Sequence, residues 1–165
     1  MTYTNGKVDN SDGIYCERVD GEVLCQSKAI ERYLGRRFNL MGANDFESAK
    51  VDSICECVRD FKLDYQAVRK LPESEREAGM KTWFSETLPG KLAALEHIVG
   101  NTHSVGTGVT LADIVLYSFL TQFFDDKESV NNAMNNTLKI KSVVESVGKL
   151  EGVQNWLNTR PETSF

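Results

Sequence analysis

The stretch that most constrains the fold lies between residues 109 and 124 and reads VTLADIVLYSFLTQFF. Its apolar residues fall on every side of a helix, and a helix of this kind is buried at the centre of a bundle. The helix should begin at TLAD, where Thr110 supplies a hydroxyl and Asp113 a carboxylate three residues later. This spacing predicts a capping box, in which the two side chains satisfy free backbone N–H groups. We expect a structural role for the pair, and Thr110→Ala should cost about 0.5–2 kcal/mol.

Helical patterns fill most of the chain on both sides of this stretch. Apolar residues recur at helical spacing in residues 46–70, 74–99, 137–147 and 150–158. Pro72 separates the first two helices, Ser74 is placed to cap the second, and Pro89 should kink it. Residues 125–136 are polar and predict a loop or a weak helix. The sequence therefore predicts an all-α bundle of about five helices.

The first 41 residues have a different pattern. Residues 14–19 and 22–25 have strand composition, and the Asp20-Gly21 pair between them is a hairpin turn signal. A helical pattern follows over residues 27–37, and the loop-like NLMGAND comes next. We therefore expect two domains, residues 1–41 and residues 42–165. A two-stranded hairpin is marginal by itself, so another part of the protein must cover it.

Composition and charge exclude several classes of function. The net charge of −5 and the pI near 5.1 argue against a nucleic-acid partner and an anionic membrane, since both need a basic surface. No apolar run approaches the roughly 20 residues of a membrane span, and the first 13 residues lack the apolar core of a secretory signal. We expect the four cysteines to be reduced thiols in a cytoplasmic protein. Cys-x-x-Cys and Cys/His spacings are absent, so no metal is expected.

Four stretches together resemble the glutathione transferase family. They read DGEVLCQSKAIERYLGRRFNLMG, VDSICECVRDF, GVTLADIVLY and GVQNWLNTRPETSF, and they are similar to the sigma class, which includes prostaglandin D synthases and the squid and helminth enzymes. The resemblance covers residues 14–165. It implies a mainly α fold, in which the family's C-terminal helical domain follows a partial thioredoxin-like domain made of a β-hairpin and one helix.

The resemblance also implies a binding site for glutathione as co-substrate. Gln26 and Ser27 correspond to the pair that receives the γ-glutamyl carboxylate at a helix N-terminus, which is an anion site. The alternative is a plain helix cap, which explains Ser27 but not Gln26. Asp60 corresponds to an aspartate that reaches the glutathione amino group across a dimer. Met80 and Phe165 are candidates for the hydrophobic substrate pocket.

The activity implied is conjugation of the glutathione thiol to hydrophobic electrophiles, a detoxification reaction, in a cytoplasmic homodimer formed through helix 46–70. The chain departs from the family because the strand–helix–strand unit with its thiolate-stabilising tyrosine is absent. We therefore assign no catalytic residue and expect impaired activity. The alternatives are a non-catalytic structural or dimerising relative and a fragment of a full-length enzyme. A tyrosine-containing strand–helix–strand segment in the transcript upstream of Met1 would identify the fragment.

Overall fold

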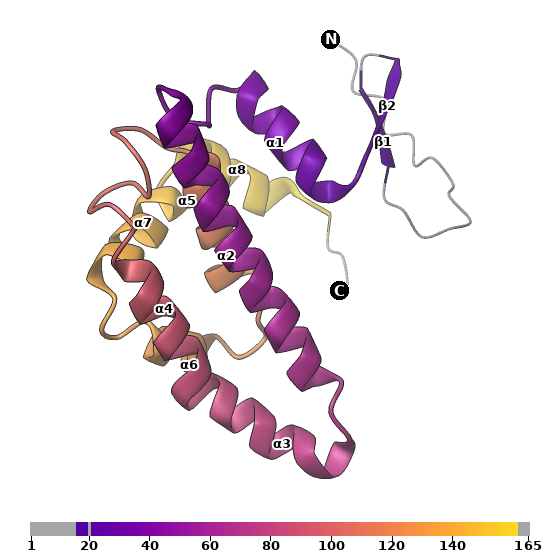
Figure 1. The fold of residues 1–165 in the computed structure, drawn as a ribbon, viewed down its shortest axis with the longest axis vertical. Helices are drawn as coiled ribbons and strands as arrows, with labels where there is room; N and C mark the ends of the chain where they lie inside the picture. The colour runs from indigo at the N-terminus through magenta and orange to yellow at the C-terminus, as the bar shows by residue number, and fades with distance from the viewer. Residues whose placement is uncertain (1–15, 20, 162–165) are drawn as a thin grey trace. The chain divides into compact units, whose positions relative to one another are not determined.

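The computed structural model describes residues 16–19 and 21–161, and the chain divides into two compact units, Met1–Met41 and Gly42–Phe165. The first unit contains strand β1 (Cys16–Val19), strand β2 (Glu22–Cys25) and helix α1 (Ser27–Arg37). The strands pair antiparallel, with Val19 opposite Glu22 and Cys16 opposite Cys25. Figure 1 shows this hairpin leading into α1.

In the second unit, all the regular secondary structure of the described residues is helical. It contains α2 (Asp45–Arg69), α3 (Glu73–Thr82), the π-helix η1 (Trp83–Thr87), α4 (Leu88–Glu96), α5 (Leu111–Thr121), α6 (Lys127–Ala133), α7 (Leu138–Gly148) and α8 (Glu151–Thr159) (Figure 1). The predicted fold class, mainly α with a β-hairpin and one helix in front, is confirmed. The helices are more numerous than the expected five, because one predicted helix is divided and α6 forms within the polar segment. Within residues 16–19 and 21–161, no helix has the length and apolar character needed to cross a membrane.

Helix α5 occupies the centre of the helical unit. It packs against α2 on one side and α7 on the other, and seven of its eleven residues are buried. The rings of Phe61 on α2 and Phe119 on α5 have centroids 6.2 Å apart, and Phe119 lies 4.9 Å from Phe124. The apolar pattern of residues 109–124 predicted a helix in the core, and the burial of α5 confirms it.

The helix predicted over residues 74–99 is interrupted before Pro89. Proline has no N–H to donate to the preceding turn. The hydrogen-bond ladder widens to π register just before it, where the Leu88 N–H donates to the Trp83 carbonyl, and Pro89 falls in the first turn of α4. Ser74 does not cap α3, since Pro72 is the N-cap residue and no described side chain accepts a cap hydrogen bond there.

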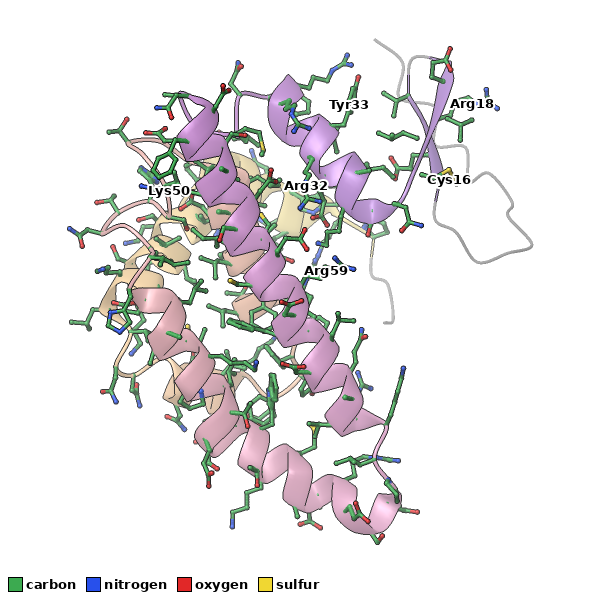
Figure 2. The ribbon with its side chains drawn as sticks, viewed as in Figure 1. Cys16, Arg18, Arg32, Tyr33, Lys50 and Arg59 are labelled. Atoms are coloured by element: carbon green, nitrogen blue, oxygen red, sulfur yellow. A yellow bond between two sulfur atoms is a disulfide. The ribbon has the colours of Figure 1, made fainter. Side chains whose placement is uncertain are left out.

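The cysteines correct the expectation of four reduced thiols. Cys16 and Cys25 are joined by a disulfide between β1 and β2 (Figure 2). Their pairing follows from the hairpin register, which sets the two residues directly opposite each other with Cα atoms 3.9 Å apart. Cys55 and Cys57 on α2 are free thiols, the first buried and the second half-buried.

Candidate functional site

The first turn of α1 begins from a strained backbone. Gln26 is the N-cap residue, and its carbonyl accepts hydrogen bonds from the N–H groups of Ala29 at 2.9 Å and Ile30 at 3.0 Å. Its φ of 74° and ψ of 117° lie in a region that side-chain-bearing residues rarely adopt. Such a conformation costs about 1–3 kcal/mol and is concentrated at functional sites. The strained start of α1 is therefore a candidate functional site.

The same turn is open to an outside acceptor. No side chain among the described residues accepts a cap hydrogen bond at α1, and the first turn contains no acidic residue. Ser27 is the first helical residue and not the cap, which corrects the expectation that its hydroxyl caps the helix. Lys28 is engaged nearby, with its Nζ 2.7 Å from Glu31 Oε2. The leading backbone N–H groups of α1 are therefore available to a bound anion.

Other helices of the chain have their first turns supplied with negative groups. Helices α2, α3, α6 and α8 have acidic residues in the first turn. Helix α7 has none, but the carboxylate of Glu96 from α4 lies at its start and accepts from the N–H groups of Lys139 at 2.8 Å and Ile140 at 3.1 Å. The α7 turn shows how a helix start of this protein binds both oxygens of a carboxylate.

The start of α5 is closed by its own residues. Asp113, with no exposed surface, accepts hydrogen bonds from the Thr110 N–H at 2.7 Å, the Thr110 hydroxyl at 2.5 Å and the Ser104 N–H at 2.6 Å. Thr110 and Asp113 form a capping box, and Asp113 also ties the preceding loop to the helix. The carboxylate has no access to a substrate, so its role is structural.

Asp60 lies on an exposed part of α2. Glu56, one turn earlier, receives a hydrogen bond from the Arg59 guanidinium, whose Nη1 lies 3.0 Å from Glu56 Oε2. Gln26 and Ser27 belong to one compact unit and Asp60 to the other. Phe165 lies outside the described residues.

Two features were not anticipated from the sequence. One is the Cys16–Cys25 disulfide, which a two-residue turn at Asp20-Gly21 would have indicated by setting those residues opposite each other. The other is a cavity of about 460 Å³ that opens to solvent at the surface of the helical unit. Met80, expected to line a hydrophobic site, lines this cavity, and Tyr65 lines it as well. Within the described residues, no group of three or more His, Cys, Asp or Glu side chains is placed to hold a metal ion.

Comparison with known proteins gives consistent matches. The family model described as "Glutathione S-transferase, C-terminal domain" matches residues 60–160. Glutathione S-transferase 1 of Ascaris suum is 32% identical over 154 residues, which cover 89% of this chain and 73% of the relative. The crystal structure of monomeric Na-GST-3, a glutathione S-transferase of the hookworm Necator americanus, is 26% identical with a TM-score of 0.79, and 92% of this chain covers 76% of it.

A third match is a solved structure named for a different activity. The prostaglandin synthase D of Nilaparvata lugens superimposes with a TM-score of 0.77 at 24% identity, with 90% of this chain covering 75% of that protein. At this identity the likeness concerns the fold. The family resemblance noted from the sequence, to the glutathione transferases, is confirmed by these matches.

Proposed function

Because this chain belongs to the glutathione S-transferase family, we propose that it binds glutathione at the first turn of α1 and transfers the glutathione thiol to hydrophobic electrophiles. The observation that carries the proposal is the open helix start beside the strained Gln26 backbone. The γ-glutamyl carboxylate of glutathione is the anionic group suited to this turn. Backbone N–H groups at a helix N-terminus bind such anions through hydrogen bonds and through the positive end of the helix dipole.

The carboxylate would occupy the same place at α1 that Glu96 occupies at α7. There, each oxygen accepts from one backbone N–H. At α1, the Ser27 hydroxyl and N–H and the Gln26 amide would donate to the ligand. Hydrogen bonds to an ionised acceptor are roughly twice as strong as those between neutral groups. Asp60 is proposed to receive the ammonium of the γ-glutamyl group from a second copy of the chain.

Catalysis additionally requires a thiolate. A free thiol has a pKa of about 8.5, and a donor or a positive group beside the sulfur must lower this value for appreciable reactivity at neutral pH. We assign no such donor to the described residues. Losing one preorganised donor typically costs about 10²–10³ in rate. Conjugation by this 165-residue chain is therefore proposed to be slow.

The rate of conjugation tests this proposal. Purified 165-residue protein and the Ascaris suum relative are given glutathione and a generic aryl halide under identical conditions. We expect this chain to be at least about 100-fold slower than the relative, yet faster than the uncatalysed reaction. Equal rates would contradict the impairment and require another donor within the chain. Glutathione binding without any turnover would instead support the non-catalytic relative.

Helix α2 supports the further proposal of a homodimer. Phe46 and Leu63 on this helix are 71% and 51% exposed, although α2 buries six other residues against the helical unit. The hairpin also has strand edges, which favour association. Sedimentation at micromolar concentration should give a dimer, and Leu63→Glu should shift it toward monomer. A monodisperse parent monomer would contradict this, and the monomeric Necator protein shows that a member of the family can be monomeric. A cytoplasmic location and a contribution of Phe165 to the electrophile pocket rest on the family alone.

A further inference from the structure

The cavity in the helical unit lies between α2, the α3–η1 segment and the start of α6. Its volume of about 460 Å³ is in the range of small-molecule sites, which are commonly about 300–1,000 Å³. The wall is apolar where Met80 and Phe84 line it, and Asp125 and Asp126 line it before α6. Residues of η1 form part of the wall, and π-helical turns occur often at functional sites.

Tyr65 provides an unused polar group in this cavity. Its side chain is only 6% exposed and is enclosed by aromatic rings, with Phe124 at 4.8 Å and Trp83 at 5.5 Å between centroids. Its hydroxyl has no hydrogen-bond partner in the described part of the chain. Burial raises the pKa of Tyr65, Arg69 opposes this, and the carboxylates of Asp125 and Asp126 raise it further. The hydroxyl is therefore a neutral phenol at pH 7, able to donate and to accept.

The charges in the cavity lining are unequal. Two carboxylates, Asp125 and Asp126, and one ammonium, Lys81, belong to the lining, while the Arg69 guanidinium acts on Tyr65 from outside it. Asp126 is partly occupied, since it accepts from the Ser129 N–H at 2.9 Å as the N-cap of α6. The Asp125 carbonyl accepts from the Lys127 N–H at 3.1 Å, whereas its carboxylate has no hydrogen bond or ion pair with the residues that the structure describes. Lys81 is exposed at the end of α3, where its ammonium can remain in water. An anionic ligand would meet two carboxylates, whereas a cationic one would complement them.

We propose that this cavity binds a small aromatic amine, with its ammonium on Asp125 and the Tyr65 oxygen and its ring against Met80 and Phe84. An ammonium has three donors and no acceptor, which suits a carboxylate together with a phenol oxygen. The aromatic wall adds cation–π and stacking contacts. An amine is not an electrophile for a thiol, so this ligand is not a substrate of the proposed conjugation. The site is thus a second one, independent of glutathione.

Three probes that share an indole ring and differ in net charge test the preference of the cavity for a cation. Tryptamine is cationic at neutral pH, 3-methylindole is neutral and indole-3-propionate is anionic. Calorimetry or ligand-observed NMR on the 165-residue protein should show tryptamine binding at least about tenfold more tightly than either of the others. Equal or tighter binding of indole-3-propionate would overturn the proposal, and so would the absence of tryptamine binding at millimolar concentration.

Substitutions of the residues that line the cavity test whether tryptamine binds there. Asp125→Asn should weaken tryptamine binding about tenfold, and Tyr65→Phe, which keeps the ring in the core, about three- to tenfold. Glu128→Gln is the matched control, because Glu128 is an acidic residue of the same segment that does not line the cavity. It should change affinity less than about twofold. Melting curves verify folding of all three. Parent-like affinity in both Asp125→Asn and Tyr65→Phe would overturn the site, as would displacement of tryptamine by saturating glutathione.

Discussion

At the first turn of α5, the buried carboxylate of Asp113 accepts three hydrogen bonds and leaves no room for a ligand, whereas at the first turn of α1 no described side chain serves as a cap. Both turns belong to short helices of eleven residues with the same need for acceptors. At α5 the need is met within the chain and the helix start is part of the core. At α1 it is left to solvent or to an anion.

The start of α7 is intermediate and explains the difference. Its acceptor is a carboxylate within the chain, but one brought from another helix by Glu96. Within the described residues, a helix start therefore accepts a carboxylate that is local, as at α5, or distant in sequence, as at α7. What distinguishes α1 is the strained Gln26 backbone, which holds the open turn in place at a cost to stability.

Replacing Asp113 with Ala removes the acceptor at the start of α5 and should have the largest effect on stability. Two buried N–H groups and the Thr110 hydroxyl would lose their acceptor, and each buried group left unsatisfied costs about 1–3 kcal/mol. We expect a loss of about 3 kcal/mol in the free energy of unfolding, measured by denaturant titration. Asp113→Asn, which keeps one acceptor oxygen, should lose less. A loss below about 0.5 kcal/mol for Asp113→Ala would contradict the structural role.

Replacing Glu96 with Ala should open α7 and give it a start like that of α1. The N–H groups of Lys139 and Ile140 would exchange the carboxylate for water, at a cost of about 1–2 kcal/mol, since the site is only half-buried. Thermal unfolding checks the loss. Added acetate at high concentration should restore part of the stability of Glu96→Ala and leave the parent unchanged. The absence of any rescue would argue against an intrinsic carboxylate preference of such turns.

Replacing Gln26 with Gly should separate the effect of backbone strain from that of ligand binding at the start of α1. Glycine adopts positive φ without a steric penalty, and relief of about 1–3 kcal/mol of strain is partly offset by the greater freedom of glycine in the unfolded chain. We expect a net gain of about 1 kcal/mol in stability together with weaker glutathione binding. Gln26→Ala is the control, because it removes the amide and keeps the strain. A destabilised Gln26→Gly would show that the side chain, and not the turn, supports the local fold.

The smallest effect concerns the exposed cap of α6. Hydrogen bonds from the Ser129 side chain and backbone lower the pKa of Asp126 below its ordinary value of 3.8. A lowered pKa in the folded state means that the charge stabilises the protein above pH 3.8, and that this contribution is lost as the pH falls through the folded-state pKa. Asn is also a good N-cap residue, so Asp126→Asn isolates the charge. Its melting temperature should be slightly below that of the parent at neutral pH and equal to it in strong acid. A constant difference at all pH values would contradict the assignment.

Much of the fold follows from the sequence because its signals are local. The all-round apolar helix, the TLAD box and the break at Pro72 each report on a few neighbouring residues. The division of the 74–99 helix by a π turn was missed because a proline indicates that the ladder changes but not whether it kinks or widens. The sequence predicts a loop or a weak helix at α6 because its residues are polar. A short helix of this kind depends on its Asp126 cap.

The site was less accessible to sequence reasoning. The family resemblance implied a ligand role for Gln26 and Ser27, which stays a prediction. The cap was expected at Ser27 because serine is a common N-cap residue, and the backbone angle of Gln26 has no sequence signal. The Tyr65 cavity depends on elements that are distant in sequence and meet only in the folded chain. The role of Asp60, proposed to act across a dimer, depends on contacts outside a single chain.

Glutathione affinity of the parent, Ser27→Ala and Gln26→Ala, measured by calorimetry, tests the central claim that the open start of α1 is a ligand site. Each variant should bind glutathione about 5- to 30-fold more weakly, which corresponds to about 1–2 kcal/mol for a hydrogen bond to a charged group. Neither side chain makes a cap bond to the described residues, so both variants should melt at nearly the parental temperature. Parental affinity in both variants would contradict the claim and leave the α1 turn as an uncapped helix end.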